Sequence, residues 1–343
     1  MQRTRPIPEW ALHTAFLAVF GLLIWFSFSP GGLPSLPTEY PDALLSFKTM
    51  FIGIALEALP FILLGILVSS LMQEFVSERT IQRFIPRNPI LGVLFGCALG
   101  MLFPICECGL IPVIRRLMHK GMPLYIAVVF ILAGPIANPI VFAATYAAFR
   151  GNPELVYARM GLALLVASAI GLLLLRLVKS NPLKNSRSTM YGERASAMEH
   201  RHHAGGGGGN RLMRIAGHAS DEFFEMGKYL MFGALVTAAI QTFVPRSELV
   251  QLGQGEWTAP LFMMGLAYLL SICSTSDAFV ASSFATSFSA GSLLAFLVFG
   301  PMLDLKSTAM LLSVFRARFV LLLAGLILVS VWIGAVAAQN WLF

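Results

Sequence analysis

The sequence predicts an all-α polytopic membrane protein built from two inverted-topology repeats, with broken or re-entrant helices and one extra N-terminal transmembrane helix. Three observations predict this fold: the composition, a series of apolar runs, and a resemblance between the two halves. Of the 343 residues, 57% are hydrophobic and 12% are charged, whereas a soluble domain carries roughly 25% charged residues. The net charge of +7 then indicates basic cytoplasmic loops, and no nucleic-acid partner is expected.

The first apolar run, Trp10–Phe28, follows Arg3 and Arg5 and precedes no small-residue cleavage site. We therefore expect a retained anchor helix with a cytoplasmic N-terminus. The loop Gly31–Ser46 has acidic residues and no Lys or Arg, as an outer loop would. A second span is expected at Phe47–Met72.

A third span, Pro89–Leu102, leads into Ile105–Leu117, which contains Cys-Glu-Cys and the first residues of a basic cluster, Arg115 and Arg116. If this segment were an ordinary outer loop, Arg115 and Arg116 would lie outside. If it turns back through part of the membrane, they lie inside, as the positive-inside rule favours. We therefore predict a re-entrant segment here, with the basic cluster as a topology anchor.

The next expected span, Met122–Phe149, is broken at Gly134-Pro135 and Asn138-Pro139, and the span Leu155–Val178 returns to the inside. The hydrophilic segment that follows, residues 179–221, is rich in Lys, Arg and Gly. We interpret it as a flexible cytoplasmic linker. Its Glu199–His203 cluster is expected to be solvated, and transient metal binding is the alternative.

The second half repeats this pattern of spans and breaks. Spans are expected at Glu222–Val244, Thr258–Cys273, Leu293–Phe315 (broken at Gly300-Pro301) and Phe319–Ala337, with the polar stretch Ser274–Ser292 between the second and third. This order puts Arg316 inside and the C-terminus outside.

The two halves align with a constant offset of 168 residues. Between Glu57–Val76 and Glu225–Val244, seven of 20 positions are identical. Two parallel copies of an apolar helix are the alternative, but the Arg and Lys placement favours inverted repeats. The predicted organisation is an anchor and outer loop (1–46), a first repeat (47–178), the linker (179–221) and a second repeat (222–343).

Three thiols form the first candidate site. Cys106 and Cys108 in the first half and Cys273 in the second are placed by the repeat to meet near the membrane midplane. Thiolates are soft ligands that suit Cu(I), Zn(II) or trivalent arsenic, so these three residues are the candidate metal or metalloid ligands. Cys97, within an apolar helix, is expected to be a packing residue.

The other candidate substrate-binding residues are acids, residues at the predicted helix breaks, and serines. Glu107 and Asp277 are acids at membrane depth, where such groups are usually paired or carry protons or cations. Asn138 and Asp304 follow the matching Gly-Pro pairs, so they either bind a ligand at a broken helix or cap it. The remaining members of the set are Pro135, Pro301, Ser274 and Ser276.

The blocks PICECGLIPVIRRLMHKGMP…AGPIANP and SICSTSDAFVASSF…FGPMLDLKS resemble the bacterial predicted-permease family that includes the organoarsenical efflux permeases. The resemblance runs from Phe47 to Ala337. By that resemblance Cys106 and Cys108 match the first-half cysteine motif, and Ser274, Ser276 and Asp277 match the second-half motif. The resemblance implies a permease of the bacterial inner membrane that exports trivalent organoarsenicals with the help of membrane cysteines.

We therefore expect a secondary transporter of a small thiophilic solute, with possible proton coupling through Glu107, Asp277 or Asp304. It is not expected to be an enzyme or to need a cofactor, and the oligomeric state is open. A zinc or copper permease and a thiol redox or metal-relay membrane subunit are the alternatives; a channel fits less well, since acids lie beside the thiols. No Walker-type phosphate-binding motif is present.

Overall fold

The computed structural model describes residues 41–75, 81, 83, 85–86, 88–103, 106–178, 182–183, 209–243 and 257–342. The predicted anchor helix Trp10–Phe28 and the Glu199–His203 cluster lie outside these ranges. Apart from one isolated β-bridge between Leu183 and Phe315, the regular structure of the described residues is helical. The helices are α2 (Pro41–Phe75), α4 (Pro89–Leu102), α5 (Glu107–His119), α6 (Leu124–Ala133), α7 (Pro139–Ala148), α8 (Pro153–Leu177), α10 (Gly209–Phe243), α12 (Thr258–Leu270), α13 (Asp277–Ser283), α14 (Ala290–Met302), α15 (Leu305–Val314) and α16 (Ala317–Trp341).

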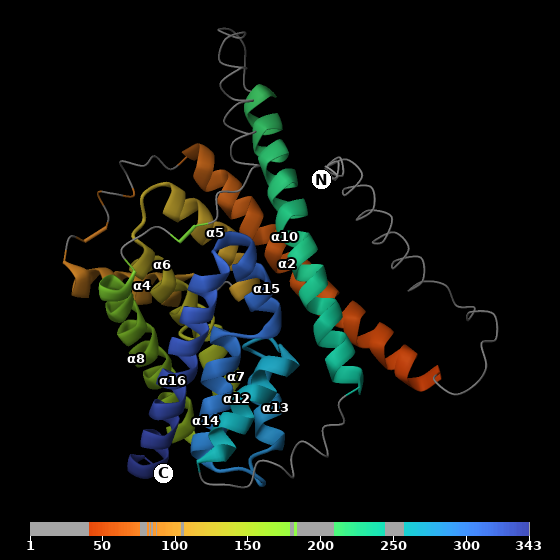
Figure 1. Ribbon diagram of the computed structural model, residues 1–343, viewed down its shortest axis with the longest axis vertical. Coiled ribbons are helices and arrows are strands. Elements are labelled where there is room, and N and C mark those ends of the chain that lie inside the picture. Colours follow the sequence, from red (N-terminus) through yellow and green to blue (C-terminus); the bar gives the residue numbers. More distant parts are fainter. Residues whose placement is uncertain are drawn as a thin grey trace, which may run out of the picture.

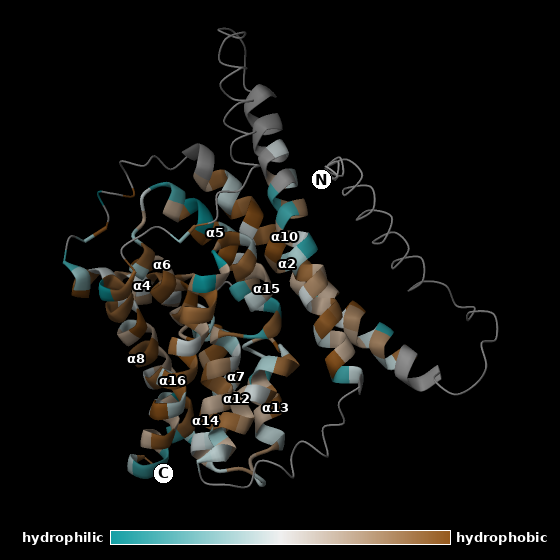
Figure 2. Cartoon of the chain, in the orientation of Figure 1, coloured by the Kyte–Doolittle hydropathy of each residue, from teal (hydrophilic) through white to brown (hydrophobic). Residues whose placement is uncertain are grey.

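The predicted membrane location is confirmed by the length and surface of these helices. Among the residues that the structure describes, five segments are long and apolar enough to cross a bilayer: Leu45–Met72, Pro153–Leu177, Glu222–Thr242, Ala290–Val314 and Ala317–Trp341. Large apolar side chains such as Leu94, Leu165 and Leu321 are more than half exposed, as expected where a helix faces lipid. Figure 2 shows hydrophobic residues along most of the bundle and hydrophilic ones mainly toward helix ends.

The two halves have the same order of helices and run in opposite directions. The offset of 168 holds at both ends of the long helices, because Pro41 of α2 corresponds to Gly209 of α10 and Phe75 to Phe243. The end of α2 meets the start of α10, where Ser69 donates to Glu222 at 3.1 Å. The start of α2 meets the end of α10, where Phe51 packs with Ala234 and Ala238. The inverted pair is visible as two crossing helices in Figure 1, in which α8 and α16 are also antiparallel.

Each repeat contains a re-entrant helical hairpin. In the first repeat α4 and α5 have 14 and 13 residues, which at about 1.5 Å per residue is about 20 Å, shorter than a hydrocarbon core of about 30 Å. The open side of this hairpin, where α4 begins and α5 ends, lies at one end of the bundle. At that end Lys120 Nζ donates to the Met72 carbonyl at 2.6 Å. We call this end, with Arg115, Arg116 and Lys120, the basic end. The hairpin α12–α13 opens toward the opposite end, where the α16 residue Trp332 donates to the Trp257 carbonyl.

Each repeat also contains one span made of two half-helices. The first, α6 and α7, is interrupted over residues 134–138, as predicted. In the second, α14 continues through Gly300-Pro301 to Met302, so the predicted position of the break was wrong by about one turn. The chain breaks at Leu303-Asp304 instead, because Asp304 caps α15 and Leu303 leaves the helical conformation.

The second long helix begins before the predicted linker ends. α10 starts at Gly209, so residues 209–221 are helical and not part of a flexible segment. Strong helix formers in that stretch, among them Arg211, Leu212, Met213 and Arg214, favour extending the apolar helix toward its N-terminus.

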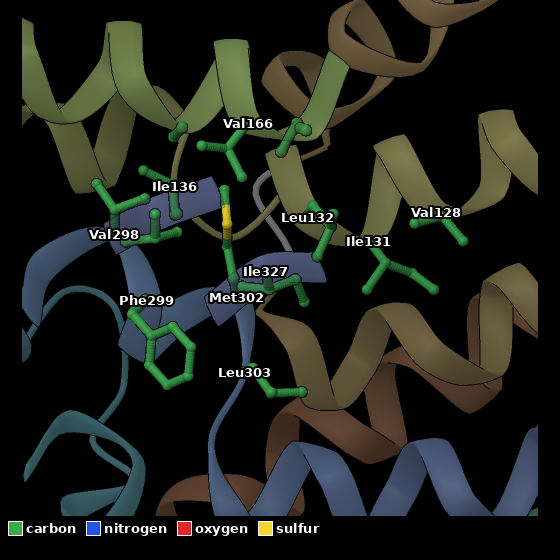
Figure 3. Packing of buried hydrophobic residues seen from close by; sticks show 14 of the residues in the cluster. Val128, Ile131, Leu132, Ile136, Val166, Val298, Phe299, Met302, Leu303 and Ile327 are labelled. Carbon is green, nitrogen blue, oxygen red and sulfur yellow. The ribbon is translucent and has the colours of Figure 1, made fainter. Parts of the chain in front are cut away.

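The core lies where the two repeats meet. Figure 3 shows Leu132 of α6 and the following Ile136 near Met302 and Val298 of α14, with Val166 of α8 and Ile327 of α16 beside them and Val128 and Ile131 further along α6. These residues are at most 4% exposed. The interrupted helices α6 and α14 thus lie in the middle of the protein, and the long helices α8 and α16 pack around them.

Replacement of Gly65 by alanine is expected to destabilise this packing. A Cβ there would strike the Gly109 backbone of α5, whose Cα would be 2.6 Å away, and backbone cannot rotate aside. We expect a loss of about 1–3 kcal/mol, seen as a lower unfolding temperature in detergent. Gly53→Ala, on the same helix with no heavy atom within 4 Å of the added carbon, is the control; equal melting of both variants would contradict the close contact.

Candidate functional site

Four interruptions of the chain come together inside the bundle. They are the tips of the two hairpins, at Phe103 and Cys106 and at residues 271–276, and the two breaks, residues 134–138 and 303–304. α5 packs on α15 of the other repeat, as α13 packs on α7. The tip of the second hairpin is tied to the second break, since Leu305 N donates to Ser271 Oγ at 3.1 Å. Ser271 itself has a positive φ of 45°, a strained backbone conformation of the kind that often occurs at functional sites.

The first hairpin tip carries the Cys-Glu-Cys motif. Cys106 is the N-cap residue of α5, makes no side-chain capping bond and is half-buried. Glu107 and Cys108 begin the helix and are 4% and 2% exposed. Cys106 and Cys108 are separated in sequence by Glu107 alone. The tip therefore offers one half-buried thiol, a buried thiol two residues later, and a buried carboxyl group.

Glu107 pairs with a lysine from the other repeat. Lys306 Nζ lies 3.6 Å from Glu107 Oε1 and 3.9 Å from Asp304 Oδ2. All three residues are at most 4% exposed. Within the described residues, Glu107 Oε2 and Asp304 Oδ2 have no hydrogen-bond partner. Lys306 was not among the residues predicted from the sequence, whereas the structure makes it a link between the two halves.

The second hairpin is held by an equivalent ion pair. Asp277 is the first residue of α13, as Glu107 is of α5, and it accepts a hydrogen bond from Arg159 at 2.7 Å. Arg159 also donates to the Ser274 carbonyl and to Thr145 Oγ1. Its side chain has no exposed surface. Each hairpin tip thus places an acid against a cation from the other repeat.

Asn138 and Asp304 both cap the half-helices that follow the breaks. Asn138 Oδ1 accepts from Val141 N at 2.9 Å, and Asp304 forms a reciprocal capping box with Ser307. The capping role that the sequence left open is therefore confirmed for both. Pro135 is buried within the first break, and Pro301 is buried one residue before the end of α14.

The remaining predicted residues belong to the second hairpin. Cys273 is half-buried with its Sγ 3.6 Å from Thr275 Oγ1, Ser274 is buried, and Ser276 is exposed as the N-cap of α13. Within the part of the chain that the structure describes, no three His, Cys, Asp or Glu side chains form a group that could hold a metal ion. The three-thiol site thus remains a prediction, and these thiols are not arranged as a preformed metal centre.

Arg159 was missed in the sequence, although a signal for it was present. It is a basic residue within the otherwise apolar segment Leu155–Leu174, and ionisable residues inside membrane spans are costly and usually functional. Cys97, in contrast, packs between α4 and α8 with its sulfur 3.7 Å from Ser168 Oγ. This contact agrees with the packing role expected for Cys97.

Ion pairs join α5 to α10 at the basic end. Arg115 contacts Glu225 at 2.9 Å, and Arg116 contacts Glu222 at 3.4 Å. Arg115 and Glu222 are 7% and 4% exposed. The basic cluster, predicted to be a topology anchor, therefore connects the first hairpin to the first helix of the second repeat.

Comparison with known proteins now identifies the family. A family model described as "Predicted permease" matches residues 43–340. The chain belongs to the predicted-permease family. This permease is 47% identical over 302 residues to "UPF0718 protein YcgR" of Bacillus subtilis, a match that covers 87% of the permease and 99% of that protein.

A second relative of the permease carries a more informative name. It is a Streptococcus mutans protein named "Putative two-component membrane permease complex subunit", 36% identical over 285 residues, covering 83% of the permease and 92% of the relative. No solved structure matches the permease. Membership of this family points to transport of a small molecule across a membrane, and it leaves the substrate open.

Proposed function

We propose that this permease is a secondary transporter that exports a small thiophilic solute, with trivalent organoarsenicals as the substrate class. The observation that carries the proposal is the meeting of two inverted repeats at interrupted helices, with Cys106 at the first hairpin tip and Cys273 at the second. Inverted repeats that meet at broken helices are typical of transporters with alternating access.

The thiols provide chemistry suited to this solute. Trivalent arsenic binds sulfur ligands more readily than oxygen ligands. Cys106 and Cys108 lie two residues apart at the tip of the first hairpin, and we propose that they bind the arsenic together. Cys273, at the tip of the second hairpin, would supply a third sulfur as the repeats move. Ser274, Ser276, Asn138 and the prolines would shape the polar lining.

The proposed direction of transport is supported by the difference between the two ends of the bundle. We assign the basic end to the cytoplasm of the bacterial inner membrane, because basic residues are retained on that side. In this structure two ion pairs, Arg115–Glu225 and Arg116–Glu222, connect the helices at that end. Such contacts would close the cytoplasmic entrance while the solute leaves on the other side.

Serine replacement of the tip cysteines tests this function. In everted vesicles we expect the wild-type protein to accumulate methylarsenite. We expect Cys106→Ser and Cys108→Ser to accumulate it at least about tenfold more slowly, since the oxygen of serine is a poor substitute for a soft sulfur ligand. Cys97→Ser, whose sulfur lies in helix packing, is the matched control. Unchanged uptake in all variants, or none in wild type, would exclude cysteine-dependent arsenical export.

A metal-ion permease or a relay subunit is the second candidate, favoured by the name of the Streptococcus mutans relative as a complex subunit. A relay would exchange metal or thiols with a partner protein and need not move solute. Zinc and copper uptake in the same vesicles, with a search for a co-purifying membrane protein, separates these functions. Metal accumulation without arsenical flux would favour the second candidate.

A further inference from the structure

A groove of about 850 Å³ lies between α8 of the first repeat and α16 of the second. The two helices are antiparallel, so the start of α8 lies beside the end of α16, at the end of the bundle opposite the basic end (Figure 1). Ligand pockets have volumes of about 300–1,000 Å³, and this groove falls in that range. None of the described residues that line it belongs to the candidate substrate-binding set.

The sequence of each helix explains why the groove forms. On α8 the lining residues recur at intervals of three and four positions and therefore share one helical face: Glu154, Tyr157, Ala158, Gly161, Leu162 and Leu165. The lining of α16, from Gly334 to Leu342, has the same spacing. Small residues leave the space open, since a Cβ added at Gly161 would meet no heavy atom within 4 Å. A side chain at Gly334, in contrast, would clash with Leu162, so the helices are in close contact there.

The depth of the groove matches one leaflet of a bilayer. Along α8 it extends from Glu154 to Leu165, which at about 1.5 Å per residue is about 16 Å. Leu165 is the middle residue of this membrane-spanning helix, and half of a hydrocarbon core of about 30 Å is about 15 Å. A transmembrane helix of a second copy or of a partner would need a seam along the whole span. An acyl chain of one leaflet needs only this half.

The polarity of the lining changes along the groove as it does along a phospholipid. Glu154 lies at the mouth, is exposed and forms no ion pair within the described residues. Tyr157 and Trp341, also near the mouth, are exposed aromatic residues, of the type that occurs at the level of lipid headgroups. Beyond them the lining consists of Ala, Gly and Leu. A carboxylate, an aromatic zone and an apolar channel thus follow one another from the surface inward.

The charge at the mouth selects the headgroup. Among the described residues that line the groove, Glu154 is the charged one. Its carboxylate attracts an ammonium group and repels a lipid with net negative charge. The faces of Tyr157 and Trp341 also favour a cation. A primary ammonium donates charge-assisted hydrogen bonds to a carboxylate, whereas a quaternary ammonium has no N–H to donate.

We propose that this groove binds one phospholipid with an ethanolamine headgroup. The ammonium pairs with Glu154, and an acyl chain lies between α8 and α16 as far as Leu165. Because α8 belongs to the first repeat and α16 to the second, the lipid contacts both repeats. This site goes beyond the proposed transport function and does not depend on the solute.

Native mass spectrometry of the purified, delipidated permease tests the site with phosphatidylethanolamine, phosphatidylglycerol and phosphatidylcholine added at equal concentrations. We expect wild type to bind one phosphatidylethanolamine at least about tenfold more tightly than either other lipid. Glu154→Gln, at an exposed position, is expected to fold normally and to lose this preference. Gly161→Trp fills the groove and is expected to weaken phosphatidylethanolamine binding at least about tenfold. Gly325→Trp is the matched control, because Gly325 is an exposed glycine of α16 outside the groove whose added Cβ would also meet nothing within 4 Å.

Three results would overturn the proposal. They are equal binding of the three lipids by wild type, a preference that persists in Glu154→Gln, and binding that is unchanged in Gly161→Trp. If Gly161→Trp does not fold, Gly161→Leu takes its place. A dimer or a co-purifying protein that Gly161→Trp removes would assign the groove to a protein and also overturn the lipid site. Absence of methylarsenite uptake would reject only the arsenical substrate, because the lipid measurement contains no solute.

Discussion

Arg159→Met is expected to yield almost no folded protein. The substitution leaves Asp277 buried and unpaired and removes the donors to Ser274 and Thr145. Breaking a buried pair by removing one partner costs about 3–5 kcal/mol, a large share of the roughly 5–15 kcal/mol that stabilises a typical folded protein. Fluorescence-detected gel filtration after heating in detergent measures the fraction that remains folded.

The second variant in this experiment also removes the unpaired charge of the Asp277 carboxylate. Arg159→Met combined with Asp277→Asn is expected to recover much of the folded fraction, since an amide is far less costly to bury than an unpaired carboxylate. Arg176→Met, at an exposed position of the same helix, is expected to behave as wild type. A single variant as stable as the control would mean that the Arg159–Asp277 pair does not hold the second hairpin.

Charge reversal at Arg115 is expected to open the basic end. Arg115→Glu places two carboxylates where an ion pair of 2.9 Å now joins α5 to α10, and like charges at that distance repel. Breaking a buried interhelical charge pair costs about 2–5 kcal/mol. We expect a membrane-impermeant maleimide applied at this end to label Cys106 at least about tenfold faster than in wild type.

The exchanged pair is the control for this prediction. Arg115→Glu with Glu225→Arg restores opposite charges and is expected to return labelling to the wild-type rate. Labelling is measured with Cys97, Cys108 and Cys273 replaced by serine, so that Cys106 is the reporting thiol. Equal labelling in the single and double variants would show that this ion pair does not control access.

The half-length helices could be predicted from the sequence because their signals are local. Gly134-Pro135, Asn138-Pro139 and the basic residues after the Cys-Glu-Cys motif define the first break and the re-entrant hairpin, and both are confirmed. The second break was predicted at the wrong position, because a proline can lie inside a helix when neighbouring groups tolerate the loss of one backbone hydrogen bond. Pro301 lies inside α14, and the capping residue Asp304 sets the boundary.

The ion pairs across the site could not be predicted, because their partners are distant in sequence. Arg159 and Asp277 are separated by 118 positions, and periodicity carries no information on such pairing. Lys306 has no charged counterpart in the first repeat, so the resemblance between the halves did not point to it. The repeat located the acids Glu107 and Asp277, whereas the bases that hold them come from α15 and α8.

The short arms of the two hairpins have an electrical consequence. Because α4 and α5 reach only part of the way through the bilayer, a charge at their tip is separated from each surface by about half of the membrane voltage. Moving one elementary charge across 100 mV takes about 2.3 kcal/mol, so reaching the tip from either surface takes about 1.2 kcal/mol. Any charged step at Glu107 would therefore depend on membrane potential from both sides, and a voltage clamp would detect it as a transient current.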